Sequence, residues 1–490
     1  MARRRKKTKT PKRRSPSASP AASRGGRFSL ISLGCPKALV DSERMAGSLA
    51  EAGFELVAEG EPADGILVNT CGFLADARAE SEAAIDDALR LKREGRVGRV
   101  VVAGCLVNHQ GTALTERFPE VDCFLPLADE RQVVATLEGG TPRAEGKTSV
   151  ATIQEGEAPA EPSRPEPSRP ETPLAHDGAH GAATPRLRLT LPHVAYLKIA
   201  EGCNRLCSFC AIPAIRGRYV SRPMGEIEVE ARALVESGVR ELVIIAQDTS
   251  YYGVDRDGRP QLAELLRRLE TIDGLAWIRL MYLYPAHLTD ELLDVIAGSG
   301  RVLPYMDLPL QHIDDQMLQR MRRQVSRRTT EELLDRLRQR IPNLTLRTTM
   351  IVGFPGETEQ QFAELTEFVR RQRFERLGAF AYSDEPGTAA HQLEGKLPDG
   401  TIRQRLDALL ALQAGIAADW GRQQVGARRR VIIDAPLAEQ PGVYLARSAA
   451  DAPEVDGTVY LTAEEGPLQP GDFVECEVVA SQGYDLIAVV

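Results

Sequence analysis

From residue 194 onwards, short apolar segments alternate with amphipathic helical patterns, and this alternation limits the possible folds more than any other feature of the chain. The six apolar segments are Val194–Ile199, Leu242–Gln247, Trp277–Tyr282, Met306–Pro309, Leu344–Val352 and Leu377–Tyr382. Helical patterns such as Glu226–Glu236, Leu262–Leu269, Glu291–Ala297 and Thr358–Arg371 lie between them. Six βα units with right-handed crossovers predict a parallel sheet that curls into a partial barrel.

Three cysteines, Cys203, Cys207 and Cys210, follow the first of these segments. Their spacing, Cys-x3-Cys-x2-Cys, puts three thiolates on one short loop at the catalytic face of such a barrel, without a fourth ligand nearby. A structural zinc site needs four ligands, usually as two separated pairs. An iron–sulfur cluster that keeps one iron open for another ligand needs three. The spacing favours an open cluster over a zinc loop completed by a distant His or Cys.

A second α/β pattern precedes this region and also carries three cysteines. The apolar segments Phe28–Leu33, Gly65–Asn69 and Arg99–Ala103 are followed by Cys35, Cys71 and Cys105 in turn. The first intervening helix is expected from about Asp41, with Asp41 or Ser42 as its cap. Because parallel sheets collect functional groups at the carboxyl ends of their strands, the three cysteines should converge on one edge. A buried apolar thiol is the alternative for any one of them.

The remaining sequence divides the chain into five parts. We expect a disordered basic tail at 1–26, an N-terminal domain at 27–140, a low-complexity linker at 141–189, a barrel at 190–423 and a C-terminal domain at 424–490. Short β-rich runs between Gly, Pro and Asp turns predict a small antiparallel barrel for the last part. The tail carries nine positive charges in its first 14 residues and no negative ones, so it could contact RNA phosphates or remain a solvated tail.

The composition of the chain predicts its location in the cell. The chain is 43% hydrophobic and 27% charged, and it lacks both a long apolar run and a signal peptide, so neither a membrane span nor secretion is expected. Eight cysteines in 490 residues are too sparse for a disulfide framework. Reduced thiols and a cytoplasmic location are therefore expected.

Several motifs together resemble the methylthiotransferase family of radical S-adenosylmethionine (SAM) enzymes. They are Ser32-Leu-Gly-Cys-Pro-Lys37 with Val40-Asp-Ser-Glu43, Asn69-Thr-Cys-Gly-Phe73, Gly104-Cys-Leu106 and the triplet Cys203, Cys207 and Cys210. The resemblance covers about residues 27–140 and 190–490. It implies an N-terminal α/β methylthiotransferase domain, a central partial (β/α)6 radical SAM barrel and a C-terminal TRAM β-barrel.

The resemblance also implies cofactors and site residues. It assigns Cys203, Cys207 and Cys210 to a [4Fe-4S] cluster that starts radical chemistry on S-adenosyl-L-methionine. It assigns Cys35, Cys71 and Cys105 to an auxiliary [4Fe-4S] cluster that handles the methylthio group. Phe209 is expected to pack beside the cofactor or to shield the cluster. Glu357 is expected either to touch the cofactor or to shape the Gly-Phe-Pro-Gly-Glu turn, and a reductant protein is expected as electron donor.

Two branches of this family differ in substrate. One modifies an aspartate of the small-subunit ribosomal protein S-twelve, alone or within the ribosomal subunit, and the other modifies an adenosine of transfer RNA. The runs Tyr196–Gly202, Ile245–Thr249 and Tyr305–His312 resemble the ribosomal-protein branch. Residues 426–490 hold four basic and eleven acidic side chains, which suits a basic protein better than RNA. An electron carrier or a zinc-dependent nucleic-acid-binding module fits the two triplets less well.

Overall fold

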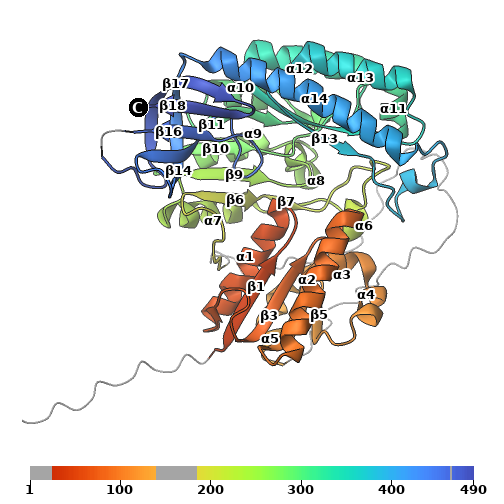
Figure 1. Ribbon diagram of the computed structural model, residues 1–490, viewed down its shortest axis with the longest axis vertical. Helices are drawn as coiled ribbons and strands as arrows, with labels where there is room; N and C mark the ends of the chain where they lie inside the picture. The colour runs from red at the N-terminus through yellow and green to blue at the C-terminus, as the bar shows by residue number, and fades with distance from the viewer. Residues whose placement is uncertain (1–24, 140–184, 464–465) are drawn as a thin grey trace, which may run out of the picture.

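The computed structural model describes residues 25–139, 185–463 and 466–490. Most of the expected basic tail and linker, including the RNA contact suggested for the tail, lies outside the described residues. An N-terminal α/β domain lies below a central parallel sheet with its helices, and a small barrel packs beside that sheet (Figure 1). In the described part of the chain, no helix is long and apolar enough to cross a membrane.

The N-terminal domain is a parallel sheet in the order β2-β1-β3-β4-β5. Its strands are β1 (Arg27–Ser32), β2 (Glu55–Leu56), β3 (Ala63–Thr70), β4 (Val97–Gly104) and β5 (Cys123–Leu125). Its helices are α1 (Pro36–Glu51), α2 (Ala75–Arg93), α3 (Cys105–Gln110), α4 (Thr112–Arg117) and α5 (Val133–Leu137), with a 3-10 turn η1 (Leu127–Gln132). Alternate residues of β4 enter opposite cores, Val100 on the side of α2 and Val101 on the side of α1 and α5.

The start of the first helix differs from the expectation. α1 begins at Pro36 instead of near Asp41, and Cys35 occupies its N-cap in an extended conformation without a side-chain cap bond. Proline favours the first helical position because its fixed φ suits the turn and its missing N–H costs nothing there. Asp41 and Ser42 are therefore buried inside the helix, where they are free to bond to other elements.

The central sheet confirms the six expected strands, all parallel, in the order β13-β12-β11-β10-β9-β6. The strands are β6 (Val194–Lys198), β9 (Glu241–Ile245), β10 (Trp277–Leu280), β11 (Val302–Asp307), β12 (Thr345–Val352) and β13 (Arg376–Ala381). The two-residue strands β7 (Ala200–Glu201) and β8 (Val220–Ser221) pair beside them.

The helices of this region are α6 (Ile212–Arg216), α7 (Met224–Glu236), α8 (Val254–Asp257), α9 (Leu262–Glu270), α10 (Asp290–Gly298), α11 (Asp315–Arg320), α12 (Arg327–Arg340), α13 (Glu359–Gln372) and α14 (Asp399–Gln424). Three 3-10 turns accompany them, η2 (Thr249–Tyr251), η3 (Pro285–His287) and η4 (Ala389–Gln392).

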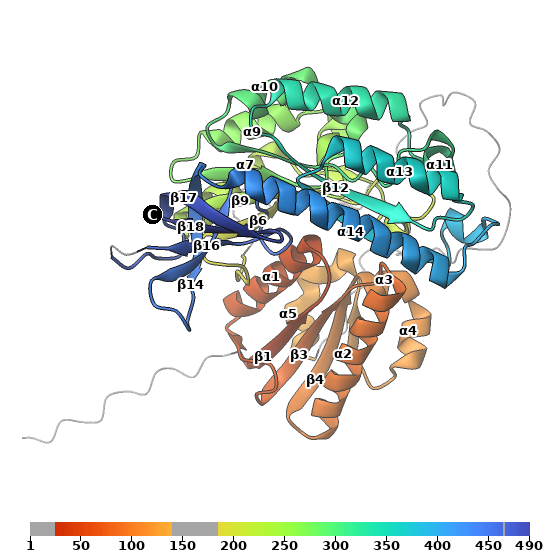
Figure 2. The same cartoon turned by 45° about the horizontal axis from the view of Figure 1, so that its top comes forward.

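Both faces of the central sheet are buried, but by different partners. The larger core joins one face to the long helices, as Leu266 of α9 and Leu365 of α13 illustrate. On the other face, Tyr196 and Trp277 pack against Val40 of α1 and Ile432 of the C-terminal barrel. A view turned by 45° shows the N-terminal domain and the barrel meeting the central region side by side (Figure 2). One sheet therefore holds the other two domains in place.

The C-terminal domain is a closed five-stranded barrel in the order β14-β15-β16-β18-β17. Its strands are β14 (Arg428–Pro436), β15 (Val443–Ser448), β16 (Val459–Thr462), β17 (Phe473–Gln482) and β18 (Asp485–Val489). The expected antiparallel pairing holds for every neighbouring pair except β16 and β18, which run parallel. Strand directions cannot alternate all the way around a ring with an odd number of strands, so at least one parallel pair is required for closure.

Candidate functional site

The N-terminal cysteines lie at the carboxyl ends of three neighbouring strands, as expected. Cys35 caps α1 after β1, Cys71 follows β3 directly, and Cys105 is the first residue of α3 after β4. Cys35 is exposed, Cys71 is half-buried and Cys105 is buried. Because β1, β3 and β4 are adjacent in the sheet, the three thiols share one edge.

Glycines beside these cysteines bring their loops together. A Cβ added to Gly34, which has a φ of +98°, would lie 3.0 Å from the Cβ and 3.3 Å from the Sγ of Cys71. A Cβ on Gly72 would lie 2.8 Å from the backbone oxygen of Cys105. A larger residue at either position would push the cysteine-bearing loops apart, so the glycines hold the triplet close.

The second triplet lies on the loop between β7 and α6, and its sulfurs accept hydrogen bonds from the protein. The backbone N–H of Arg205 donates to Cys203 Sγ at 3.3 Å, and the backbone N–H of Ile212 acts to lower the pKa of Cys210. Arg323 Nη1 donates to Cys207 Sγ at 3.5 Å. In the first triplet, the backbone N–H of Phe73 acts to lower the pKa of Cys71. Such bonds favour thiolates and tune the potential of an iron–sulfur cluster.

Burial controls the acidity of the thiols. Burial raises the pKa of Cys203 to about 11 and that of Cys210 to about 12, and the neighbouring Cys207 adds to both shifts. Burial also raises the pKa of Cys105 to about 12, which Cys35 reinforces and Arg216 opposes. Within each triplet, the charge of one thiolate therefore disfavours ionisation of another thiol. Iron binding would displace the thiol protons, since the ligand is the thiolate.

The residues of both triplets fit three-cysteine clusters by their donor chemistry. Each triplet offers three thiols, and the N–H···S bonds described above are oriented toward thiolate sulfur. Within the described ranges, no group of three or more His, Cys, Asp or Glu side chains is gathered tightly enough to hold one metal ion. A four-iron cluster takes one thiolate for each ligated iron.

The short helix α6 connects the two triplets. It begins two residues after Cys210, and its Ile215, together with Ala211 before it, packs against Cys105 in one small apolar cluster. At the end of the same helix lies Arg216, whose charge acts to lower the pKa of the Cys105 thiol. The loop that carries the second triplet therefore rests directly on a cysteine of the first.

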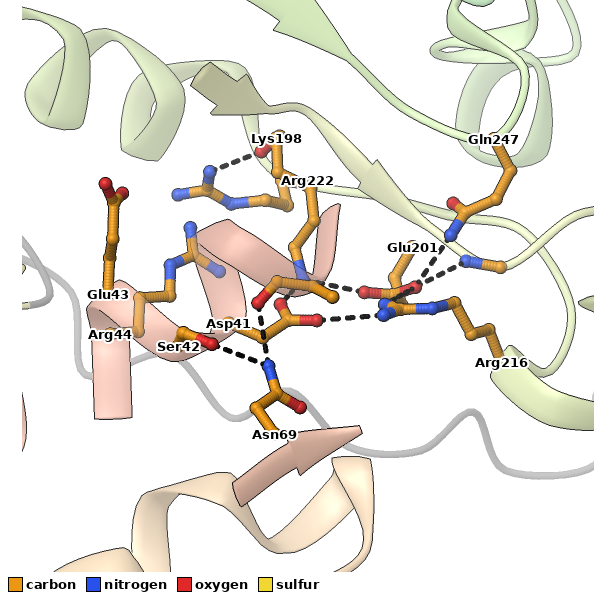
Figure 3. A network of polar contacts seen from close by, with 12 residues as sticks. Asp41, Ser42, Glu43, Arg44, Asn69, Lys198, Glu201, Arg216, Arg222 and Gln247 are labelled. Carbon is orange, nitrogen blue, oxygen red and sulfur yellow. Dashed lines mark hydrogen bonds and ion pairs between the residues drawn. The ribbon is translucent and has the colours of Figure 1, made fainter. Parts of the chain in front are cut away.

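A buried ionic network reinforces this contact between the domains (Figure 3). Asp41 of α1 forms ion pairs with Lys198 of β6 and, at 3.0 Å, with Arg216 of α6. Glu201 accepts from Lys198 at 2.8 Å, from Arg216 at 2.9 Å and from Gln247 at 3.1 Å. Because all these groups are largely enclosed, their mutual pairing is required to offset desolvation.

A second set of buried ion pairs lies next to the first. Glu230 of α7 binds Arg44 of α1 at 3.0 Å, Arg186 at 2.9 Å and Arg222 at 2.7 Å. Arg186 also pairs with Glu43 of α1. The described end of the expected linker is thus bound to both domains at their interface.

Lys37 lies on the same interface, closer to the cysteines. Its side chain is buried on the first turn of α1, and its Nζ lies 2.9 Å from the centroid of the Tyr282 ring. Burial lowers the pKa of Lys37 to about 8, and Cys35 opposes the shift. Tyr282 follows β10 with a φ of 61°, which is rare for a residue other than glycine.

Curated relatives with the same extent identify the family. The ribosomal protein uS12 methylthiotransferase RimO of Syntrophus aciditrophicus is 42% identical over 464 residues, which is 94% of this chain and 97% of the relative. The protein of the same name from Myxococcus xanthus is 41% identical over 459 residues, 94% of this chain and 90% of that one. The chain belongs to the RimO family of methylthiotransferases. The resemblance inferred from the motifs is confirmed.

Family models divide the chain in the same way. The Radical SAM superfamily matches 197–369, the Uncharacterized protein family UPF0004 matches 27–126 and the TRAM domain matches 425–490. Radical SAM enzymes use a [4Fe-4S] cluster with SAM, so the RimO family carries both, and the UPF0004 match is consistent with a second cluster. The fold is also similar to that of the radical S-adenosylmethionine methyltransferase TsrM from Kitasatospora setae, with a TM-score of 0.51 and 15% identity over 86% of this chain and 77% of that one.

Phe209, which lies between Cys207 and Cys210 in the sequence, and Glu357 have different surroundings. Phe209 is partly buried against the apolar cluster that contains Met321 and Phe354. Glu357 is buried, and its carboxylate accepts from Arg405 at 2.6 Å, from the N–H of Gly353 at 2.8 Å and from His312 at 3.2 Å. These partners stabilise the turn, while contact of either residue with the cofactor stays a prediction.

Sequence reasoning missed Lys37, Arg216 and Arg323 as site residues. Arg323 stacks on Tyr284, with its guanidinium carbon 4.3 Å from the ring centroid, besides bonding to Cys207. The only available signal was the position of Lys37 and Arg216 near cysteines in the sequence. The two remaining cysteines, Cys123 and Cys476, are buried in apolar cores away from the triplets.

Proposed function

We propose that the chain is a radical SAM methylthiotransferase that attaches a methylthio group to the β-carbon of an aspartate in ribosomal protein uS12. Cys203, Cys207 and Cys210 would hold the radical SAM cluster, and Cys35, Cys71 and Cys105 would hold an auxiliary [4Fe-4S] cluster. When bound, these groups would supply the electron that cleaves SAM and the sulfur that is transferred. A reductant protein would deliver that electron from outside.

The observation that carries this proposal is the packing of α6 on Cys105. Ile215 and Arg216, which follow the second triplet, contact the first triplet through its most buried cysteine. The two cysteine sets are therefore adjacent, and a substrate carbon between them could meet both.

The remaining residues contribute binding, orientation and exclusion of water. The backbone N–H of Arg205 and the guanidinium of Arg323 would hold the thiolates of Cys203 and Cys207 in place. The ion pairs of Asp41 with Lys198 and Arg216 fix the N-terminal domain on the central domain. Rigid positioning of this kind is the main part that a protein plays in cofactor chemistry.

The charge of the TRAM domain supports a basic protein substrate, although less strongly than composition suggests. Three of its acidic residues, Asp434, Asp451 and Asp456, are used in packing on the central sheet. Asp434 pairs with His193, Asp451 with Arg376, and Asp456 accepts from the Tyr305 hydroxyl at 2.7 Å. Glu439, Glu454 and Asp472 remain exposed and can face a basic partner.

The test is an anaerobic reaction of the reconstituted protein with SAM and reductant, offered uS12 and transfer RNA together. Mass spectrometry should find a methylthio increment on an aspartate peptide of uS12, and Cys71→Ala and Cys203→Ala should each abolish it. Cys476→Ala, which changes a buried cysteine outside both triplets, serves as the control and should keep the product. An increment on an adenosine of transfer RNA would overturn the proposed substrate.

A further inference from the structure

Lys37 is a buried lysine at the boundary between the first triplet and the rim of the central sheet. Its side chain is 6% exposed, and it follows Cys35 by two residues. Its Nζ lies over the ring of Tyr282, at the carboxyl end of β10. The ammonium group therefore lies where the N-terminal domain meets the central sheet. This position lies on the side of the barrel where the cysteine loops meet.

Lys37 differs from the other lysines in its lack of a counterion. The described ranges contain four lysines, and three of them pair with a carboxylate: Lys92 with Asp122 at 2.7 Å, Lys198 with Asp41 and Glu201, and Lys396 with Asp384 at 2.6 Å. For Lys37, the most buried but one, no carboxylate oxygen of the described residues lies within 4.0 Å. A buried charge without a partner is costly unless a ligand completes it.

The carboxylate of Asp307 already has other partners and is not a counterion of Lys37. Asp307, at the end of β11, pairs with Arg347 at 2.8 Å and accepts the backbone N–H of Tyr282 at 3.0 Å. This second bond holds Tyr282 in its left-handed conformation, with its ring beneath the ammonium. Strained backbone of this kind concentrates at ligand sites. The ring faces one side of the ammonium, and the donors on its other side are available to an anion.

We propose that Lys37 binds the side-chain carboxylate of the substrate aspartate. The inference rests on the proposed function, since it names the group of uS12 that the site recognises. The carboxylate is bonded directly to the carbon that receives the methylthio group. An ammonium group two residues from Cys35 therefore fixes the reacting carbon beside the first triplet, and it selects aspartate over asparagine because only the former is charged.

The experiment is a binding cycle with the cluster-loaded protein under anaerobic conditions, without SAM. Two proteins, the wild type and Lys37→Met, are titrated with uS12 and with uS12 whose target aspartate is changed to asparagine. Loss of a hydrogen bond between charged groups should weaken binding of unmodified uS12 to Lys37→Met by about tenfold or more. The asparagine form should bind both proteins equally, Lys37→Arg should restore most of the discrimination, and Lys92→Met should behave as the wild type.

Two results would overturn the inference. The first is a Lys37→Met protein that loses equal affinity for both forms of uS12, because this would make Lys37 a structural residue. The second needs no variant: the wild type would bind the aspartate and asparagine forms with the same affinity. If the wild type still methylthiolates uS12 in that case, only the proposed role of Lys37 is wrong. Product on transfer RNA alone would instead contradict the proposed function itself. Iron content and visible absorbance of each variant verify that its clusters are present.

Discussion

Arg216 shows how a single side chain can link the two cysteine triplets. Arg216 is buried, pairs with Asp41 and Glu201 and acts through its charge on the Cys105 thiol. Its planar guanidinium binds two carboxylates through separate nitrogens, which a lysine could not do with the same geometry. The charge of Arg216 also opposes the burial that raises the pKa of Cys105.

Glu130 is an acidic group near this network whose burial is only partly offset by the charges of Lys198 and Arg216. Its residue is partly buried, and its Oε1 is enclosed without a hydrogen-bond partner within the described residues. Burial, reinforced by the charge of Asp41, raises the pKa of Glu130 to about 8. The carboxyl group is therefore protonated at neutral pH, whereas an unfolded chain would ionise it near pH 4.5.

Glu130→Gln should accordingly stabilise the protein, and more so as the pH rises. Between about pH 4.5 and 8 the unfolded state of the wild type releases a proton that the folded state keeps, so its stability falls with pH. The slope is at most about 1.4 kcal/mol per pH unit, and the glutamine variant lacks it. Denaturant midpoints measured at pH 5, 6, 7 and 8 check this prediction. Parallel curves for the two proteins would refute it, and exposed Glu138→Gln is the control.

For individual residues, the sequence predicted functional groups whose spacing is visible in the chain. It did not predict contacts that folding makes between residues far apart in the sequence. Cys203, Cys207 and Cys210 are visible in one run of residues, and three strand ends pointed to the other cysteines. Lys37 and Arg216 could not be found in this way, since their partners Tyr282 and Asp41 lie far away in the sequence. Asp41 was expected to cap a helix and instead forms ion pairs inside it, because Pro36 starts the helix earlier.

Among the secondary-structure elements, α6 has the largest effect for its size. It comprises five residues, yet its Ile215 is 2% exposed against Cys105 and Ala211. So short a helix has little stability of its own and depends on this packing. The position of α6 between the two triplets therefore depends on the packing of a few side chains.

Ile215→Ala should separate the two triplets functionally. Removing a buried isoleucine side chain should cost about 2–5 kcal/mol, here taken from the contact between α6 and the first triplet. We expect cleavage of SAM to persist while the yield of methylthio product per SAM cleaved falls. Ile272→Ala is the matched control, because Ile272 is equally buried in the core behind the sheet. If both variants lose the same yield, the effect is general destabilisation.

The elements themselves were largely predictable from hydrophobic periodicity. The strands of the central sheet appear as apolar runs because both faces of the sheet are covered. In the C-terminal barrel, Arg447 of β15 is polar but buried, because it pairs with Glu241 and Asp434 of other elements, a contact that no local pattern reports. The parallel pairing of β16 with β18 is likewise a consequence of closure, which no local pattern reports.

At the scale of the whole molecule, the interface between the N-terminal domain and the central domain contains several buried ion pairs. Glu230 lies at its centre, 5% exposed, with three guanidinium partners. Burial alone would raise its pKa, but Arg222, Arg44 and Arg186 hold the pKa of Glu230 far below its usual range. Two of these partners, Arg44 and Arg186, also belong to the segments that attach the N-terminal domain. Loss of this carboxylate should therefore loosen the joint between domains.

Glu230→Gln should destabilise the folded protein by about 3–5 kcal/mol at pH 7, because it leaves buried guanidinium groups without their counterion. The folded pKa is depressed, so the contribution of Glu230 is fully present above about pH 4.5 and is lost as the pH falls further. The gap between wild type and variant should thus be constant from pH 7 to 5 and shrink below pH 4.5. Denaturant unfolding followed by tryptophan fluorescence measures it, with Glu228→Gln, on the same helix but paired to the exposed Arg232, as a control expected within about 0.5 kcal/mol of wild type. A gap that persists unchanged to pH 3 would show that the carboxylate charge does not hold the domains together.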